Sequence, residues 1–228
     1  MLTKACRFLF GFLGVCILST ESTSNFHFFD LIFLANVVTY GSHLKLLNTV
    51  YNVRLHSHDI GYGSGSGQQS VTGLQDVTQK GSYWVVRKDH QTGNVYYRGE
   101  PVKCGQIIRL THMETNKNLH SHHFQAPISR NLEVSAFGNN GEGDIGDNWE
   151  LICNGGMWTR DDEIKLRHVV TSSYLHVSGN TYQHPIPGQF EVSASSSTYG
   201  SSWKAAEGIF IQPSNLTVKS HEKQHEEL

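Results

Sequence analysis

The sequence has little net charge and no apolar run long enough to cross a membrane. Its 228 residues include 18 lysines and arginines and 20 aspartates and glutamates, a formal net charge of −2 at pH 7. This balance gives no electrostatic reason to expect nucleic acid or an anionic membrane as a partner. Two apolar stretches, residues 8–18 and 26–38, fall short of the about 20 residues that span a bilayer. We therefore expect a soluble mature chain with no membrane span.

A helical pattern is missing as well. No stretch keeps apolar residues at positions i, i+3, i+4 and i+7. Short segments alternate instead, as Leu44 and Leu46 do with His43 and Lys45, which are expected on the opposite face of a strand. The chain has 22 glycines and only 5 prolines, which suits tight turns between short strands. The pattern predicts an all-β protein.

Motifs that mark catalysis or cofactor binding are scarce. The sequence has no Gly-x-Ser-x-Gly elbow, and no pair of carboxylates is marked for acid–base work. The glycine-rich segment 61–67 lacks the Lys-Ser or Lys-Thr pair of a phosphate loop, so we interpret it as a hairpin loop. The acidic segment with Glu142, Asp144 and Asp147 lacks the ligand pattern of an EF-hand. We expect a protein that is not an enzyme and has no cofactor.

The N-terminus is typical of a secretory signal. Lys4 and Arg7 precede the apolar run of residues 8–18, and small residues follow at 19–22. Residues 1–24 are interpreted as the signal peptide, with cleavage placed no better than between residues 20 and 36. One acceptor sequence for N-glycosylation begins at Asn215.

Residues 214–228 form a tail that ends in a retention-like signal. The chain stops at His225-Glu226-Glu227-Leu228, which differs by one methylene from the H-D-E-L sequence that keeps proteins in the endoplasmic reticulum. Glu226 keeps the charge of the aspartate and lengthens the side chain. An entry signal and a retention signal together predict residence in the lumen of the endoplasmic reticulum.

Cysteine is scarce in the mature chain. Cys6 and Cys16 lie in the predicted signal, which leaves Cys104 and Cys153. A bond between them would close a loop of about 50 residues and stabilise the fold by about 4 kcal/mol in the chain-entropy model. An oxidising lumen favours pairing, and two free buried thiols are the alternative.

The sequence does contain a threefold repeat. His56, His120 and His176 lie in the related phrases Leu-His-Ser-His, Leu-His-Ser-His and Leu-His-Val-Ser, 64 and 56 residues apart. Each unit ends near a tryptophan, at Trp84, Trp149 and Trp203. We place the three repeats at residues 37–90, 98–153 and 154–210.

Each repeat supplies about four strands, a sheet too small to bury both its apolar face and its edges. Three such units around a pseudo-threefold axis would form a β-trefoil of twelve strands. A three-bladed propeller and an open solenoid are the alternatives. Propellers usually start at four blades, and a solenoid would need capping ends that the sequence does not show.

The histidines of the repeat invite a metal hypothesis. Alternate residues of a strand share a face, so His56 and His58 could converge, as could His120 and His122. No cysteine or acidic residue stands at ligand spacing beside them, and the third repeat has Ser178 in place of a second histidine. We therefore expect no metal and interpret these histidines as holding the hydrogen bonds of the repeat, or as lining a ligand groove. The candidate ligand or partner surface comprises Arg54, His56, His58, His120, His122, His123 and His176.

Residues 41–87 resemble the MIR module, which protein O-mannosyltransferases share with inositol trisphosphate and ryanodine receptors. Segments 45–49, 63–73, 104–106, 118–123 and 203–210 resemble the stromal cell-derived factor 2 family, whose members are small lumenal proteins of three MIR repeats. The resemblance runs from about residue 37 to 213. In that family cysteines stand at the positions of Tyr40 and Tyr96. The absence of both implies that those two pair with each other and that Cys104 pairs with Cys153.

The resemblance also implies a function. It points to an accessory protein that limits aggregation of unfolded clients beside a lumenal Hsp70 and its J-protein partner. A glycan-binding lectin that assists protein O-mannosylation is the alternative, and would need an aromatic side chain and two or three polar ones near His56, His120 or His176. A glycosidase is a third possibility, which would need two carboxylates about 5–10 Å apart in a cleft.

Overall fold

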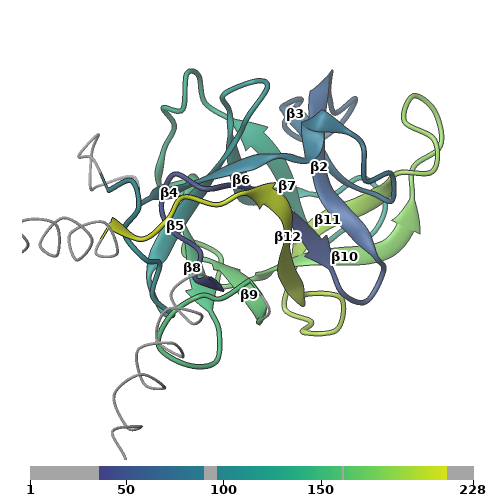
Figure 1. The fold of residues 1–228 in the computed structure, drawn as a ribbon. Coiled ribbons are helices and arrows are strands. Elements are labelled where there is room, and N and C mark those ends of the chain that lie inside the picture. The colour runs from purple at the N-terminus through teal and green to yellow at the C-terminus, as the bar shows by residue number, and fades with distance from the viewer. Residues whose placement is uncertain (1–35, 90–96, 161, 215–228) are drawn as a thin grey trace, which may run out of the picture. The chain divides into compact units, whose positions relative to one another are not determined.

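The computed structural model describes residues 36–89, 97–160 and 162–214 (Figure 1). The predicted signal peptide at 1–24, the glycosylation site Asn215 and the retention motif from His225 to Leu228 lie outside the described residues, as does Tyr96. Among the residues described, no helix is long and apolar enough to cross a bilayer.

The described residues form twelve β-strands and two short 3-10 turns, η1 (Lys80–Ser82) and η3 (Ile145–Asp147). The all-β prediction is confirmed. The strands are β1 (His43–Asn48), β2 (Val53–Gly61), β3 (Gln69–Leu74), β4 (Trp84–Lys88), β5 (Ile107–His112), β6 (Asn118–Gln125), β7 (Leu132–Phe137), β8 (Trp149–Ile152), β9 (Glu163–His168), β10 (Tyr174–Thr181), β11 (Phe190–Ser195) and β12 (Trp203–Ile209).

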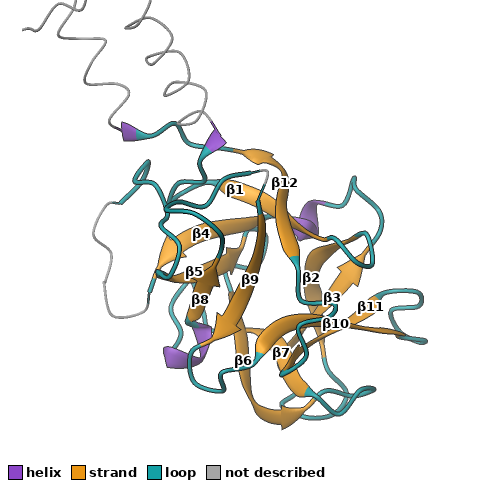
Figure 2. Cartoon of the chain, turned by 90° about the horizontal axis from the view of Figure 1, so that it is seen from below, coloured by secondary structure: helices purple, strands orange, loops and turns teal. Residues whose placement is uncertain are grey.

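Six of the strands close into a ring. β1 pairs with β4, β4 with β5, β5 with β8, β8 with β9, β9 with β12, and β12 returns to β1, all antiparallel. Closure leaves none of these six strands with a free edge. In Figure 2 this ring occupies the upper part of the described strands.

The other six strands form three hairpins, β2–β3, β6–β7 and β10–β11. Their second strands pair with one another in a triangle, β3 with β7, β7 with β11 and β11 with β3. Six strands in a ring and three hairpins across one end make a β-trefoil. Four strands lie within each of the three ranges 37–90, 98–153 and 154–210.

The core lies inside the ring and beneath the hairpins. Trp84, Trp149 and Trp203 are fully buried, and each indole Nε1 donates to the backbone carbonyl of the leucine that precedes the repeat histidine. The acceptors are Leu55 at 3.0 Å, Leu119 at 2.9 Å and Leu175 at 2.9 Å. A buried N–H without an acceptor is costly, so these bonds explain why each repeat ends on tryptophan and not on another aromatic residue.

Lys45 lies on the face of β1 opposite to Leu44, as the alternation predicts, yet it is buried. Its ammonium group donates to the carbonyl of Val77 at 2.5 Å and lies 4.5 Å from the centre of the Tyr83 ring. The segment between β3 and β4 therefore covers this face. Alternation along a strand predicts which side of the sheet a residue faces. It does not predict whether a loop from elsewhere in the chain covers that side.

Candidate functional site

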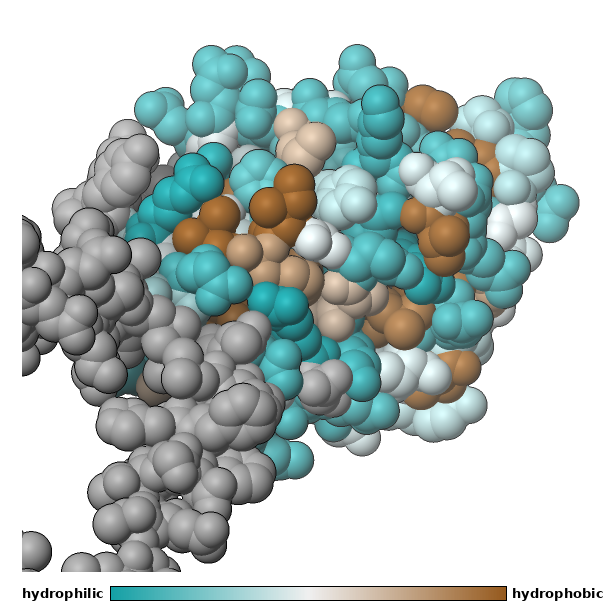
Figure 3. All heavy atoms as spheres, viewed as in Figure 1, coloured by the Kyte–Doolittle hydropathy of each residue, from teal (hydrophilic) through white to brown (hydrophobic). Residues whose placement is uncertain are grey.

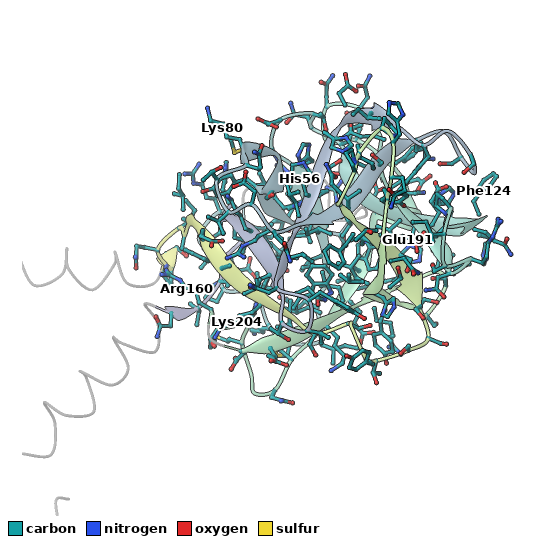
Figure 4. The ribbon with its side chains drawn as sticks, turned by 90° about the vertical axis from the view of Figure 1, so that its right-hand side faces the viewer. His56, Lys80, Phe124, Arg160, Glu191 and Lys204 are labelled. Atoms are coloured by element: carbon teal, nitrogen blue, oxygen red, sulfur yellow. A yellow bond between two sulfur atoms is a disulfide. The ribbon has the colours of Figure 1, made fainter. Side chains whose placement is uncertain are left out.

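The three repeat histidines occupy equivalent buried positions, near the start of β2, β6 and β10. Each directs its Nδ1 at a polar side chain that stands two residues before the tryptophan of the repeat. His56 meets Ser82 at 3.0 Å, and His176 meets Ser201 at 3.5 Å. His120 meets Asp147 at 2.9 Å. Figure 4 shows His56 within the body of the molecule.

A glycine precedes each of these polar residues, at Gly81, Gly146 and Gly200. A Cβ on Gly146 would lie 2.3 Å from Cε1 of His120, and one on Gly200 would lie 3.0 Å from Cε1 of His176. The histidine rings therefore pack directly on glycine backbone. The motif Gly-[Ser/Asp]-x-Trp occurs three times in the sequence and could have revealed this contact.

A second set of polar side chains contacts the backbone carbonyls of the same three glycines. Nε2 of His112 lies 3.0 Å from the carbonyl of Gly81, and Nε2 of His168 lies 2.9 Å from that of Gly146. In the first repeat Asn48 fills this position and donates to the carbonyl of Gly200 at 2.8 Å. Because a carbonyl only accepts, both histidines carry their proton on Nε2. These contacts join the end of one repeat to the start of the next.

Burial keeps several of these histidines uncharged near neutral pH. It lowers the pKa of His56 to about 4, helped by the neighbouring His58 and His112. Burial likewise lowers the pKa of His168 to about 4, although the bond to the Gly146 carbonyl opposes the shift. The pKa values of His112 and His176 are lowered for the same main reason. A neutral imidazole suits a hydrogen-bonding part of the scaffold.

In the first two phrases, which have a second histidine, it lies beside the first, as the strand period predicts. The ring centres of His56 and His58 are 5.5 Å apart, and those of His120 and His122 are 5.3 Å apart. Nε2 of His122 lies 3.0 Å from a carboxylate oxygen of the buried Glu133.

The other two members of the candidate surface, Arg54 and His123, differ in burial and in contacts. His123 is exposed to solvent. Arg54 forms an ion pair with Glu207 at 2.7 Å.

No acidic residue stands at ligand spacing beside these histidines along the chain, but the fold brings two carboxylates to the histidine of the second repeat. Asp147 and Asp144 lie 2.9 and 3.6 Å from Nδ1 of His120. Both carboxylates belong to η3 and its N-cap, 27 and 24 residues along the chain from His120. Spacing along one strand could not reveal them, because the β-trefoil brings the end of the repeat back to its second strand.

The loop of each hairpin reaches over the following repeat. The backbone N–H of Ser66 donates to Glu133 at 3.3 Å, and that of Ile128 donates to Glu191 at 2.7 Å. The third loop returns to the first repeat through Gln189, whose Oε1 accepts from the hydroxyl of Thr72 at 2.5 Å. The glycine-rich segment 61–67 is thus a hairpin loop fastened to a buried carboxylate.

Cys104 and Cys153 form a disulfide with their Cα atoms 5.3 Å apart. It closes a 49-residue separation between the segment before β5 and the end of β8. Tyr40, which stands at a cysteine position of the resembled family, is buried and donates from its hydroxyl to Oε1 of Gln106 at 3.1 Å. An aromatic side chain thus fills that place.

Comparison with known proteins shows which families this chain resembles. The MIR domain family matches residues 45–152. Mouse stromal cell-derived factor 2 is 56% identical over 181 residues, which cover 79% of this chain and 85% of that protein. The crystal structure of the SDF2-like protein from Arabidopsis thaliana superposes with a TM-score of 0.75 at 45% identity, covering 78% of this chain and 99% of that one.

A protein O-mannosyltransferase complex of S. cerevisiae bound to the sugar donor contains a similar fold. It gives a TM-score of 0.68 at 25% identity and covers 82% of this chain, but only 30% of that one. The likeness to stromal cell-derived factor 2 extends along most of both chains. The chain belongs to the stromal cell-derived factor 2 family of MIR-domain proteins.

Proposed function

We propose that the protein is a non-catalytic resident of the endoplasmic reticulum lumen that holds unfolded clients beside a lumenal Hsp70 and its J-protein. Membership of the stromal cell-derived factor 2 family and the signal-like sequences at both chain ends support this setting. The chain is nearly neutral, so client binding would rest on apolar contact and not on charge.

Apolar side chains on two adjoining turns carry the proposal. Ile145 is 56% exposed, Val169 42% and Val170 47%. The backbone N–H of Val169 donates to the carbonyl of Asn148 at 3.0 Å, which ties the two turns together. We call Ile145, Val169 and Val170 the turn patch. A small exposed apolar patch suits weak binding of extended apolar segments.

The equivalent place between the first and second repeats is more polar. There Lys80 stands for Ile145, and Met113 and Glu114 stand for Val169 and Val170. Figure 4 shows Lys80 projecting from the periphery. The turn patch is therefore not required by the fold. On the face drawn in Figure 3, apolar side chains also reach the surface as small groups among polar ones.

An aggregation assay tests the proposal. The purified protein should slow light scattering by a chemically denatured client, and I145K/V170E, which copies Lys80 and Glu114, should lose that protection. V77S removes another exposed apolar side chain outside the turn patch and should retain it. Co-precipitation with the J-protein should survive detergent. No protection by the wild-type chain, together with no J-protein recovered, would refute the proposal.

A lectin is the second candidate, and an aromatic cluster near His176 favours it. Tyr199 is 70% exposed, its ring centre lies 6.4 Å from that of Tyr51, and Tyr51 lies 5.9 Å from Phe190. Exposed rings of this kind can stack on sugars, and the yeast O-mannosyltransferase complex with a similar fold was solved with a sugar donor. A glycan array should show binding that Y199A abolishes. An array without signal above background would remove this candidate.

The structure gives a glycosidase little support. Asp147, the buried member of the acidic pair, has hydrogen bonds from Asn118, His120 and the backbone of Asp144. A carboxylate held in this way does not reach a substrate.

A further inference from the structure

The second repeat carries more negative charge beside its histidine than the fold requires. Ser82 and Ser201 partner His56 and His176 in the first and third repeats, so a hydroxyl suffices for the scaffold. In the second repeat Asp147 takes that position. Asp144, three residues earlier, stands where the other repeats have Gln79 and Thr198. Both substitutions place a carboxylate on the same imidazole nitrogen.

From this arrangement we propose that His120, Asp144 and Asp147 bind a divalent transition-metal ion of the Zn²⁺ type. The ligand atoms are Nδ1 of His120 and one oxygen of each carboxylate, and all three atoms lie within 4.8 Å of one another. Nδ1 lies 2.9 Å from Oδ1 of Asp147 and 3.6 Å from Oδ1 of Asp144. Tetrahedral bonds of about 2.0–2.1 Å place neighbouring ligand atoms about 3.3 Å apart, which these distances bracket.

Surrounding groups already orient the three ligands. Oδ2 of Asp147 accepts from Nδ2 of Asn118 and from the backbone N–H of Asp144, both at 3.0 Å, which turns Oδ1 toward His120. The imidazole packs against the backbone of Gly146, where a Cβ would lie 2.3 Å from Cε1. Such outer hydrogen bonds and packing are what hold ligands in metal sites.

Charge and exposure also fit a metal ion. Asp147 is buried, whereas 56% of the Asp144 side chain is exposed, so the site opens to solvent at one ligand. Two carboxylates and one imidazole favour Zn²⁺ over Ca²⁺, which prefers six or more oxygen ligands. The ion would displace the Nδ1 proton of His120 and leave the ring in its Nε2–H form, with water completing the coordination.

The third repeat supplies the matched variants. D144T and D147S give the second repeat the residue types that the third repeat has at the equivalent positions, Thr198 and Ser201. Asp144 is largely exposed, so D144T removes one ligand with little risk to folding, and circular dichroism verifies the fold of each variant. H123Q removes an exposed histidine outside the cluster and serves as the control for adventitious binding.

Titration of the full chain with Zn²⁺ by calorimetry, and with Co²⁺ by visible absorption, tests the site. The wild-type protein and H123Q should bind one ion, with D144T at least tenfold weaker and D147S without detectable binding at that stoichiometry. The Co²⁺ spectrum should show the intense bands of a tetrahedral site. Absence of stoichiometric binding by the wild-type chain, or equal affinity in D144T and the wild-type chain, would overturn the proposal.

Discussion

The carboxylate of Asp147 accepts a hydrogen bond from Nδ1 of His120 at 2.9 Å across 27 residues of sequence. The equivalent contacts in the other repeats are made by neutral serine hydroxyls, at Ser82 and Ser201. One position of a repeated scaffold therefore holds a buried charge in one lobe and a neutral hydroxyl in two. That difference allows the contribution of the charge to be measured within a single protein.

Replacing Asp147 should destabilise the fold far more than replacing Ser82. D147A removes the acceptor of hydrogen bonds from the side chains of Asn118 and His120 and from one backbone N–H. Losing one partner of a buried charged network costs about 3–5 kcal/mol. S82A removes one neutral hydrogen bond, worth about 1 kcal/mol. Urea unfolding at pH 7 measures both changes, and equal losses would contradict a special role for the carboxylate.

Stability should fall as the pH drops from about 6.5 to about 4. The folded-state pKa values of His56 and His168 are each about 4, below an unfolded value of about 6.5. The unfolded chain therefore binds more protons in this window, and each pKa unit of difference contributes about 1.4 kcal/mol that is fully present above pH 6.5. We therefore expect roughly 3 kcal/mol from each histidine. Urea midpoints between pH 4 and 7.5 measure this loss.

H168N should reduce that pH dependence while keeping the fold. Asparagine already fills the equivalent position as Asn48, where its amide donates to the carbonyl of Gly200 at 2.8 Å. The variant keeps a donor for the Gly146 carbonyl but has no group that titrates. A profile for H168N that matches the wild type would show that His168 does not govern the acid loss.

G65A should destabilise the protein more than G67A. Both glycines have positive φ, +65° and +69°, so alanine strains the backbone at each by about 1 kcal/mol. At Gly65 the new Cβ would also lie 2.0 Å from Oε2 of the buried Glu133, whereas nothing lies within 4 Å at Gly67. Thermal unfolding of the two variants measures this difference. The clash with Glu133 should add roughly 1–3 kcal/mol to the stability lost in G65A. Similar losses for both variants would mean that the loop moves freely aside.

Removing the disulfide should lower stability by about 4 kcal/mol. In the chain-entropy model the bond restricts a loop of about 50 residues in the unfolded chain, matching the 49-residue separation of Cys104 and Cys153. C104S/C153S should therefore unfold at lower urea than the oxidised wild type. The reduced wild type should resemble the variant, and a persistent difference between them would indicate that the serines themselves disturb packing.

Much of the architecture could be predicted because the repeat appears in the local pattern of the chain. Period-two alternation around Leu44 and Leu46 gives strands, and three phrases that end on Trp84, Trp149 and Trp203 give three units. A small sheet must bury its edges against other sheets. Three such units therefore predict a β-trefoil. The same local pattern placed His56 beside His58 and His120 beside His122.

The sequence by itself determined the strands, the repeat and the family, since these depend on neighbouring residues and on motifs that recur in order. Only the tertiary structure decided which groups face the histidines. Asp144 and Asp147 reach His120 because closure of the second repeat returns η3 to β6, and Glu133 receives Ser66 because a hairpin loop crosses into the next repeat. Contacts between distant segments follow from closure of the ring of strands. Alternation along a single strand does not predict that closure.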